Sequence, residues 1–302
     1  MSVNAEPTAL EEPLEPGREG SPLVIEPLLA GEALWPPTLY AAQGRGPIKR
    51  LRALGFRSSP ESWEARPVPV FLARHPTVGN ILVDTGLHPS IARDPRDKLD
   101  RFLARHYRVE AGEDLVTQLR ERRLTPYDIR VVVLTHLHVD HASGIEAFPQ
   151  AKFVVSATEW EAATTGSRPR LHHYNRSQYD YAFEFFTVDF DGQRIESYGP
   201  FGRSFDLFGD GSVRLAYTPG HSAGHVSVIL RLPRRDFVVI GDAAADWKQF
   251  QGQAEPMLIQ DEHNWRRSLR ELQAYRRAYP HALMVPGHDQ EFWEKLEARY
   301  EE

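Results

Sequence analysis

The sequence of 302 residues contains no cysteine, so a disulfide, a thiolate nucleophile and a cysteine-ligated zinc site are all excluded. It has no apolar run long enough to span a bilayer, and its first residues lack the basic start and apolar core of a secretion signal. It also lacks a stripe of lysine and arginine, and its formal net charge is −6. These absences predict a cytoplasmic protein with neither a nucleic-acid nor a membrane partner.

Hydrophobic residues make up 41% of the chain, which is enough to bury a sizeable core in one large domain. Residues 1–22 are rich in Glu, Pro and Gly and poor in apolar side chains, so we expect a disordered tail there. Residues 23–302 contain no internal repeat and no low-complexity linker, and we expect them to form a single domain. A homodimer remains an open alternative to a monomer.

Short runs rich in Val, Ile and Leu, bounded by Gly, Pro or Asp, predict buried strands. Helical periodicity over 113–123 and 263–279 predicts two amphipathic helices. Strands interleaved with helices predict an α/β layered fold. The expected strands lie at 68–73, 80–84, 129–135, 152–156, 213–218, 226–232, 236–240 and 282–285.

Polar side chains suited to metal binding follow several of these runs directly, in turns that contain Gly or Pro. In α/β sheets, ligands bind beyond the carboxyl ends of the strands, so scattered histidines would have no reason to recur at that place. The residues at such strand ends are Asp84, His136, His138, Asp140, His141, His221, Asp242 and His288.

The spacing within HLHVDH predicts how these side chains divide. His136 and His138 are two apart at a strand end and point the same way, so they can hold one ion. Asp140 and His141 are adjacent and must diverge, which directs them to a second ion. A carboxylate such as Asp242 can bridge both. Imidazole and carboxylate ligands suit two divalent ions, zinc first, with manganese, iron or cobalt as alternatives.

The histidines outside HLHVDH are divided between ligand, supporting and ordinary hydrogen-bonding roles. His221 and His225 have helical spacing, but the glycines and proline around them argue against a helix, so we take His221 as a ligand and His225 as its supporting neighbour. We expect hydrogen-bonding roles for the remaining histidines, with a pocket rim as the alternative for the adjacent pair; they are His75, His88, His106, His172–His173, His263 and His281.

In order along the chain, DTG at Asp84, HLHVDH (136–141), TPGHSAGH (218–225), GD (241–242) and PGHD (286–289) resemble the metallo-β-lactamase superfamily over about residues 24–300. The resemblance implies an αββα sandwich with the metals at one edge of the sheets. It also implies that His136, His138 and His221 hold one metal, that Asp140, His141 and His288 hold the other, and that Asp242 bridges them. Asp84, His225 and Asp289 would orient these ligands.

Within the superfamily the chain looks most like the N-acyl homoserine lactonases. Those enzymes often carry a tyrosine three residues after the bridging aspartate, where it helps to hold the substrate carbonyl; this chain has Ala245 there. The resemblance implies a dinuclear-metal-dependent hydrolase of a small-molecule lactone or ester. A metal-bridging hydroxide would attack the carbonyl, and Asp140 would act catalytically by passing a proton to the leaving alkoxide.

Two alternatives on the same scaffold remain open. One is a thioesterase resembling glyoxalase II, and the other is a phosphoester hydrolase with Arg168 and Arg170 as a candidate phosphate clamp. The substrate and the native metal stay undetermined at this point. We expect specificity to lie in 88–112 and in the aromatic stretch 179–186, whose side chains could equally belong to the core.

Overall fold

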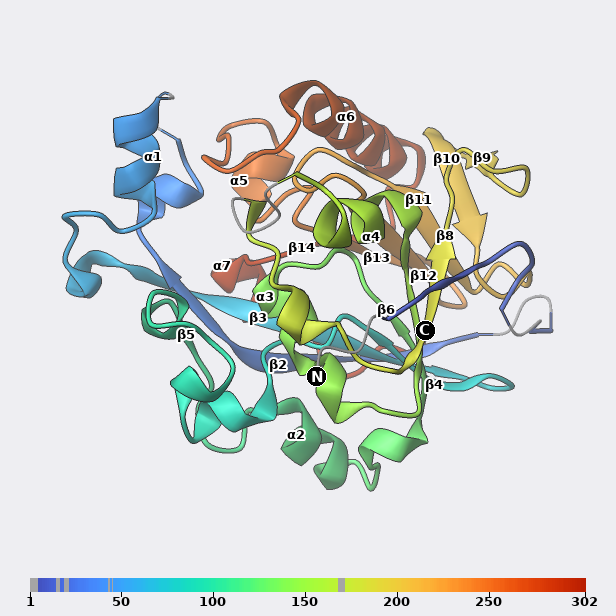
Figure 1. Ribbon diagram of the computed structural model, residues 1–302. Helices are drawn as coiled ribbons and strands as arrows, with labels where there is room; N and C mark the ends of the chain where they lie inside the picture. Colours follow the sequence, from blue (N-terminus) through green and yellow to red (C-terminus); the bar gives the residue numbers. More distant parts are fainter. Residues whose placement is uncertain (1–4, 15–16, 19–21, 43, 45, 168–171) are drawn as a thin grey trace.

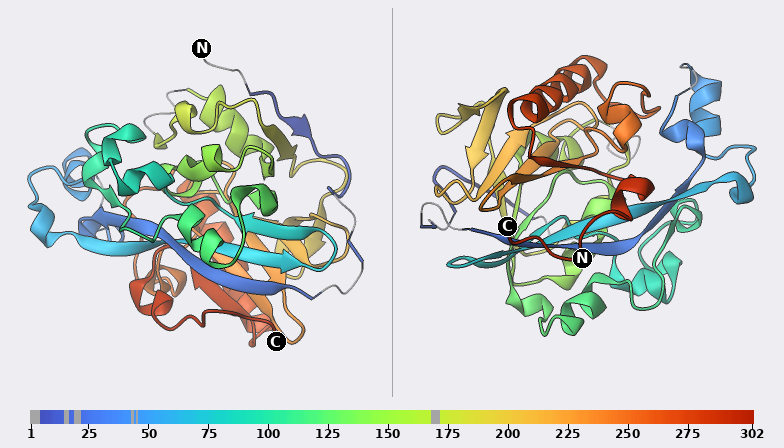
Figure 2. Two further views of the ribbon diagram at one scale, coloured as in Figure 1. Left: turned by 90° about the horizontal axis from the view of Figure 1, so that it is seen from below. Right: turned by 180° about the vertical axis from the view of Figure 1, so that it is seen from behind.

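The computed structural model describes residues 5–14, 17–18, 22–42, 44, 46–167 and 172–302. Two β-sheets pack face to face in this part of the chain, and helices cover both outer faces (Figures 1 and 2). This is the expected αββα arrangement. None of the described helices combines the length and the apolar character needed to cross a membrane.

The larger sheet has eight strands among the described residues. The first five in sheet order run parallel to one another and the remaining pairs are antiparallel. In sheet order they are β1 (Thr8–Ala9), β8 (Glu184–Val188), β7 (Lys152–Ser156), β6 (Ile129–Val133), β4 (Gly79–Val83), β3 (Glu64–His75), β2 (Val24–Trp35) and β5 (Tyr107–Arg108).

The smaller sheet has six strands in the same described part of the chain and is antiparallel except for its β13–β14 pair. In sheet order they are β14 (Leu283–Pro286), β13 (Asp236–Gly241), β12 (Val226–Arg231), β11 (Val213–Tyr217), β10 (Phe201–Asp206) and β9 (Glu196–Tyr198). The α-helices are α1 (Pro47–Ala53), α2 (Leu115–Glu121), α3 (Val139–Ala142), α4 (Ala157–Thr164), α5 (Trp247–Phe250), α6 (Glu262–Ala278) and α7 (Gln290–Trp293).

Alternation along the strands builds the layers. Val131 and Val133 of β6 belong to the core between the sheets, whereas Val132 and Leu134 belong to the core beneath α2 and α4. Successive side chains of a strand point to opposite faces, so a continuous apolar run can fill two cores at once. The same alternation in β13 supplies the core beneath α6, where Trp265 is fully buried.

The eight strands expected from the sequence are all present, but β1, β2, β5, β8, β9 and β10 were not expected. The sequence hides β2 because it contains Pro27 and Gly31, which ordinarily interrupt strands. The pairing of β2 with β3 shifts register between Leu29 and Glu32, and Gly31 lies in this irregularity at φ 126°. A Cβ atom there would lie 2.8 Å from the carbonyl oxygen of Arg108, so the close approach of β5 requires glycine.

Residues 5–14, the longest described part of the N-terminal segment, pack against the domain, in contrast to the tail expected over residues 1–22. Thr8 and Ala9 form β1, which extends the larger sheet by pairing with β8. The amide of Leu14 donates to the carbonyl of Leu207 at 2.8 Å, and the side chains of Leu10 and Leu14 pack against the core between the sheets. Few apolar residues are needed to cover a sheet edge, and so the composition of the segment concealed its packing.

We expect the double variant Leu10→Ala/Leu14→Ala to lower the free energy of unfolding by about 2 kcal/mol, because it removes half-buried apolar surface. The matched control is Glu6→Ala/Glu11→Ala, which changes exposed side chains of the same segment and should stay within about 0.5 kcal/mol of the parent. Urea titration measures both. Equal stability of the two double variants would show that the segment does not pack in solution.

Candidate metal centre

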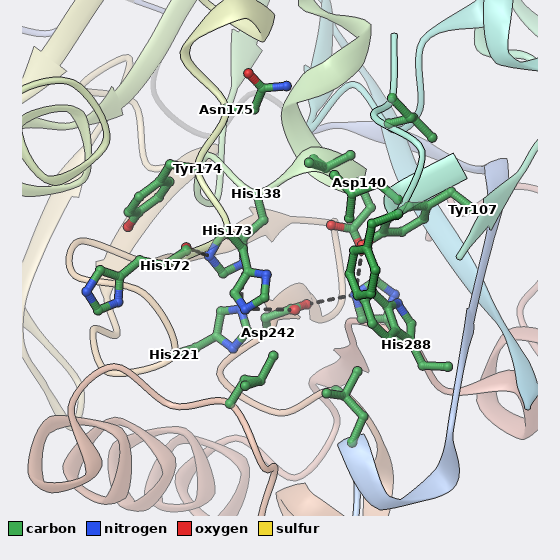
Figure 3. A pocket seen from close by; sticks show the side chains of 18 of the residues that line it. Tyr107, His138, Asp140, His172, His173, Tyr174, Asn175, His221, Asp242 and His288 are labelled. Carbon is green, nitrogen blue, oxygen red and sulfur yellow. Dashed lines mark hydrogen bonds and ion pairs between the residues drawn. The ribbon is translucent and has the colours of Figure 1, made fainter. Parts of the chain in front are cut away.

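The candidate metal ligands gather where strands of both sheets end. β4 and β6 are parallel neighbours, so Asp84 and the HLHVDH turn lie at one edge of the larger sheet. β13 and β14 are parallel neighbours too, so Asp242 and His288 lie at the matching edge of the smaller sheet. The turn that joins β11 to β12 brings His221 to the same place (Figure 3).

His136, His138 and His221 form the first cluster, with one ligand atom from each within 4.8 Å of the others. The ring centroid of His138 lies 4.5 Å from that of His136 and 4.9 Å from that of His221. The plane of the His138 ring is steeply tilted to both of these rings. His138 is held by its Nε2 atom, which donates to the carbonyl of His172 at 3.0 Å. Its Nδ1 atom is therefore left to face Nε2 of His221, 3.1 Å away.

Asp140, His141 and His288 form the second cluster under the same distance limit of 4.8 Å. Nε2 of His288 lies 3.6 Å from Oδ2 of Asp140, and Nε2 of His141 lies 4.0 Å from Oδ1. Nδ1 of His288 donates to the carbonyl of Pro67 at 2.8 Å, which turns the opposite nitrogen toward the cluster.

Asp242 lies between the two clusters. Its Oδ2 atom is 3.2 Å from Nε2 of His221 in the first, and its Oδ1 atom is 3.1 Å from Nε2 of His288 in the second. It also forms a third group of potential ligands with His136 and His141. One carboxylate thus faces both clusters, which is the position that the sequence predicts for a bridging ligand.

Two buried imidazoles test whether the cluster suits metal ions. Nδ1 of His141 is engaged by Asp84 at 2.8 Å, and Nδ1 of His136 lies 3.1 Å from the hydroxyl of Thr135. The Nε2 atom of each ring has no hydrogen-bond partner among the described residues. A buried polar atom without a partner is rare and often marks an ion. Converging imidazole and carboxylate atoms are the ligands of zinc and similar ions, so these residues fit divalent metals.

The pKa values of these histidines agree with a site for divalent metals. Burial and the surrounding imidazoles lower the pKa values of His136 and His138 well below the ordinary value. Burial would also lower the pKa of His141, but the carboxylates of Asp84, Asp140 and Asp242 outweigh it and raise that pKa to about 10. Protons on such histidines balance the buried carboxylates, and divalent ions would have to displace them on binding.

Asp84 is the residue that fixes His141. It stands directly after β4 with φ 64°, a left-handed conformation that aspartate tolerates better than most residues. Its carboxylate accepts hydrogen bonds from the amide and the hydroxyl of Thr135, at 2.7 and 2.8 Å, and from Nδ1 of His141 at 2.8 Å. The backbone conformation therefore aims one carboxylate at both the turn and the ligand that the turn carries.

His225 supports Asp242 through its backbone. Its Nε2 atom accepts from the amide of Asp242 at 3.0 Å, so its proton resides on Nδ1 and is donated to the hydroxyl of Thr218 at 3.0 Å. That hydroxyl can in turn donate to Ser227, which donates to the carbonyl of Ile240 at 2.9 Å. Burial and the imidazole of His221 lower the pKa of His225 to about 3, so it remains a neutral acceptor.

Asp289 differs from the expected orienting role, because it forms no hydrogen bond or ion pair with a ligand side chain in the part of the chain that the structure describes. Its carboxylate accepts from the amide of Phe292 at 2.9 Å and from the amide of Trp247 at 2.7 Å. It therefore caps α7 and ties the start of α5 to it. The orienting contact to His288 comes from the carbonyl of Pro67 instead, a role that no side-chain pattern could reveal.

Glu159 is a residue of the site that sequence reasoning missed. It is fully buried in α4, and its carboxylate accepts from the amide of Leu137 at 3.0 Å. Its other oxygen accepts from the amide of Gly224 and the hydroxyl of Ser222, both at 2.8 Å. Burial raises its pKa, although these donors oppose the shift. Glu159 thus fastens the turn that carries His136 and His138 to the turn that carries His221.

Both clusters contribute to the wall of a cavity of about 730 Å³, through His138 and His221 of the first and Asp140 and His288 of the second, together with Asp242. The segment 88–112 lines it from Arg96 to Asp100 and again at Phe102, Leu103 and Tyr107. The aromatic stretch 179–186 does not line it, and Tyr179 and Phe185 are instead buried in the core beneath α4. His172 and His173 lie at the cavity. His75, His88, His106, His263 and His281 lie outside both clusters.

Comparisons with known proteins agree with the fold and the ordered motifs. The pattern of the metallo-beta-lactamase superfamily matches residues 63–288, and the chain therefore belongs to this superfamily and is a hydrolase of it. Its curated relatives include N-acyl homoserine lactonase AttM of Rhizobium radiobacter, 30% identical over 232 residues that cover 75% of this chain and 83% of AttM. The probable metallo-hydrolase Rv2300c of Mycobacterium tuberculosis is 31% identical over 72% of this chain and 73% of its own.

Solved structures resemble the chain over most of its length. A crystal structure of a variant of B. thuringiensis AiiA, with N-decanoyl-L-homoserine bound at the active site, matches with a TM-score of 0.71 at 20% identity, covering 91% of this chain and 96% of AiiA. AidC, a dizinc quorum-quenching lactonase in complex with a product, matches with a TM-score of 0.60 at 16% identity, covering 92% of each chain. At these identities the likeness shows the fold.

We expect Glu159→Ala to destabilise the protein by about 3 kcal/mol or more and to weaken metal binding, because three buried donors lose their acceptor at about 1–3 kcal/mol each. Glu161→Ala changes an exposed carboxylate of the same helix and should leave stability within about 0.5 kcal/mol. Denaturant titrations with and without added zinc measure both effects. If Glu159→Ala unfolds at the same denaturant concentration as Glu161→Ala, the carboxylate does not join the two turns.

Proposed function

We propose that the protein is a dinuclear-metal-dependent hydrolase that opens a lactone or cleaves a small ester, with N-acyl homoserine lactones as the leading substrate class. The observation that carries the proposal is the pair of three-residue clusters that face Asp242 from either side and line one cavity. The likeness to curated N-acyl homoserine lactonases supports the substrate class.

In this proposal His136, His138 and His221 hold one ion, and Asp140, His141 and His288 hold the other. Asp242 contacts both. Zinc is the first choice, with manganese, iron or cobalt as alternatives, because the ligand atoms are imidazole nitrogens and carboxylate oxygens. Two bound divalent ions would activate a water for attack and polarise the substrate carbonyl.

The side chains of the protein position the ligands and supply a proton. Asp84, Glu159 and His225 hold the ligand-bearing turns by buried hydrogen bonds, so the site is organised before substrate arrives. Asp140 lines the cavity, and its carboxylate faces His141 and His288 of the second cluster. We assign it the transfer of a proton to the alkoxide that leaves when the ring opens.

The walls of the cavity suit a small polar head with an apolar chain. The lining combines polar side chains with apolar ones that could pack along an acyl chain: Trp35, Leu39, Leu99, Phe102, Leu103, Leu258 and Ile259. A phosphoester substrate would need a cationic clamp, and the two residues proposed for it, Arg168 and Arg170, lie outside the described residues. Thioesters and phosphodiesters therefore enter as competing outcomes of the test.

The test is a substrate panel on zinc-loaded protein, comprising acyl homoserine lactones, simple lactones, aryl esters, thioesters and phosphodiesters. We expect ring opening of acyl homoserine lactones to have the highest kcat/KM, and Asp242→Ala to reduce it by orders of magnitude while lowering bound metal. His263→Ala, an exposed histidine on α6, is the matched control and should leave turnover and metal content unchanged. A parent protein that opens no lactone but readily cleaves thioesters or phosphodiesters would refute the substrate class.

A further inference from the structure

Two buried tyrosines, Tyr40 and Tyr107, line the cavity beside the second cluster. Both belong to the same apolar cluster as Ala245, three residues after Asp242, whose side chain is only a methyl group. A substrate carbonyl bound over the clusters can receive no hydrogen bond from the side chain of residue 245. The phenols of Tyr40 and Tyr107 are two side chains of the cavity lining that could supply one from another part of the chain.

The hydrogen-bonding of Tyr107 leaves its proton available. Tyr107 packs edge-on against Trp35, with ring centroids 6.1 Å apart, and the indole N–H of Trp35 acts as a donor toward the phenol, which opposes the rise in its pKa. An indole N–H can only donate, so the phenol oxygen must be the acceptor. The O–H of Tyr107 is then free to donate in another direction.

The phenol of Tyr107 lies next to the candidate metal ligands. Figure 3 shows the side chain of Tyr107 beside Asp140. Burial, reinforced by the carboxylate of Asp140, raises the pKa of Tyr107 well above the ordinary value, and Asp242 acts in the same direction. The phenol therefore keeps its proton at any ordinary working pH and stands close to the groups that would surround the reacting carbonyl.

Tyr107 is also held rigidly. It forms β5, an edge strand in which Tyr107 pairs with Ala33, and the amide of Leu34 donates to the carbonyl of His106 at 2.7 Å. The ring of His106 stacks on Trp35 at 3.9 Å and on Trp63 at 4.5 Å between centroids. A donor fixed in this way needs little reorganisation when charge develops on the substrate.

We propose that the hydroxyl of Tyr107 donates a hydrogen bond to the carbonyl oxygen of the bound lactone or ester and strengthens this bond as the oxygen becomes negative during attack. Tyr107 would then be a catalytic residue supplied by β5, far in sequence from the turn that carries Asp242. The inference rests on the proposed function, because it requires a carbonyl substrate. It makes residue 245 dispensable for this purpose.

Tyr40 provides the matched comparison. It lies in the same cavity and the same apolar cluster, but the guanidinium of Arg66 covers its ring at 3.8 Å from the centroid. Arg66 also pairs with Asp246 at 2.9 Å, and the buried amide of Gln249 donates to the backbone carbonyl of Tyr40 at 2.7 Å. These contacts give Tyr40 a role in supporting the cavity wall. None of them places a hydrogen-bond donor at its hydroxyl, as the indole of Trp35 does at the hydroxyl of Tyr107.

The experiment compares Tyr107→Phe with Tyr40→Phe, each of which removes one oxygen and keeps the ring. We expect Tyr107→Phe to lower kcat about 100- to 1000-fold, the usual effect of losing one oxyanion donor, with KM changed less than about threefold. Tyr40→Phe should lower kcat less than about fivefold. Both variants should bind as much zinc as the parent.

A binding measurement separates this role from a structural one. An N-acyl cyclopentylamide carries the acyl chain but no lactone carbonyl, so its inhibition constant should be the same for Tyr107→Phe and the parent. A kcat for Tyr107→Phe within about threefold of the parent would overturn the proposal. So would a rise in KM or in the inhibition constant with kcat unchanged, or a loss in Tyr40→Phe larger than that in Tyr107→Phe.

Two further comparisons test the proposal if Tyr107→Phe does not fold or if the parent opens no lactone. Should Tyr107→Phe fail to fold, Ala245→Tyr in the parent decides, since a gain of more than about tenfold in lactone hydrolysis would show that the carbonyl lacks a donor and would contradict the proposal. If the parent opens no lactone but cleaves aryl esters, the substrate class fails, and the two Phe variants are then compared on the ester. A parent that cleaves only phosphodiesters would refute both proposals.

Discussion

The shared carboxylate of Asp242 is the constraint around which the rest of the site is organised. A buried negative charge is costly unless positive charge or hydrogen bonds compensate it, and Asp242 is surrounded by the imidazoles of His141, His221 and His288. Burial would raise its pKa, but these imidazoles outweigh burial and hold that pKa well below the ordinary value. Divalent ions can compensate the negative charge of Asp242 in place of these imidazoles, because they carry more positive charge in the same space.

The sandwich satisfies this constraint by bringing strand ends of two sheets together. One sheet contributes the turns after β4 and β6, and the other contributes those after β11, β13 and β14 (Figure 1). The turns are then locked to one another by single buried side chains. Asp84 joins two turns of the larger sheet, Glu159 joins the two sheets across the first cluster, and His225 supports the backbone of Asp242.

The sequence predicts the layers and the clusters well, because both depend on local patterns. Runs such as 129–135 show their burial directly, and histidines spaced by two show a shared direction. Contacts set by the tertiary fold could not be predicted. Glu159 looks like an ordinary helix carboxylate, and Asp289 looks like a ligand's partner but caps a helix. Tyr107 reaches the cavity only because β5 pairs with β2, a strand that Pro27 and Gly31 disguise.

The central claim is that two ions are held side by side with Asp242 between them. Anomalous diffraction from crystals of the zinc-loaded protein, recorded on both sides of the zinc absorption edge, tests it most directly. We expect two peaks about 3.5–4 Å apart, one against His136, His138 and His221 and the other against Asp140, His141 and His288. A single peak at full zinc occupancy, or peaks that Asp242 does not contact, would contradict it.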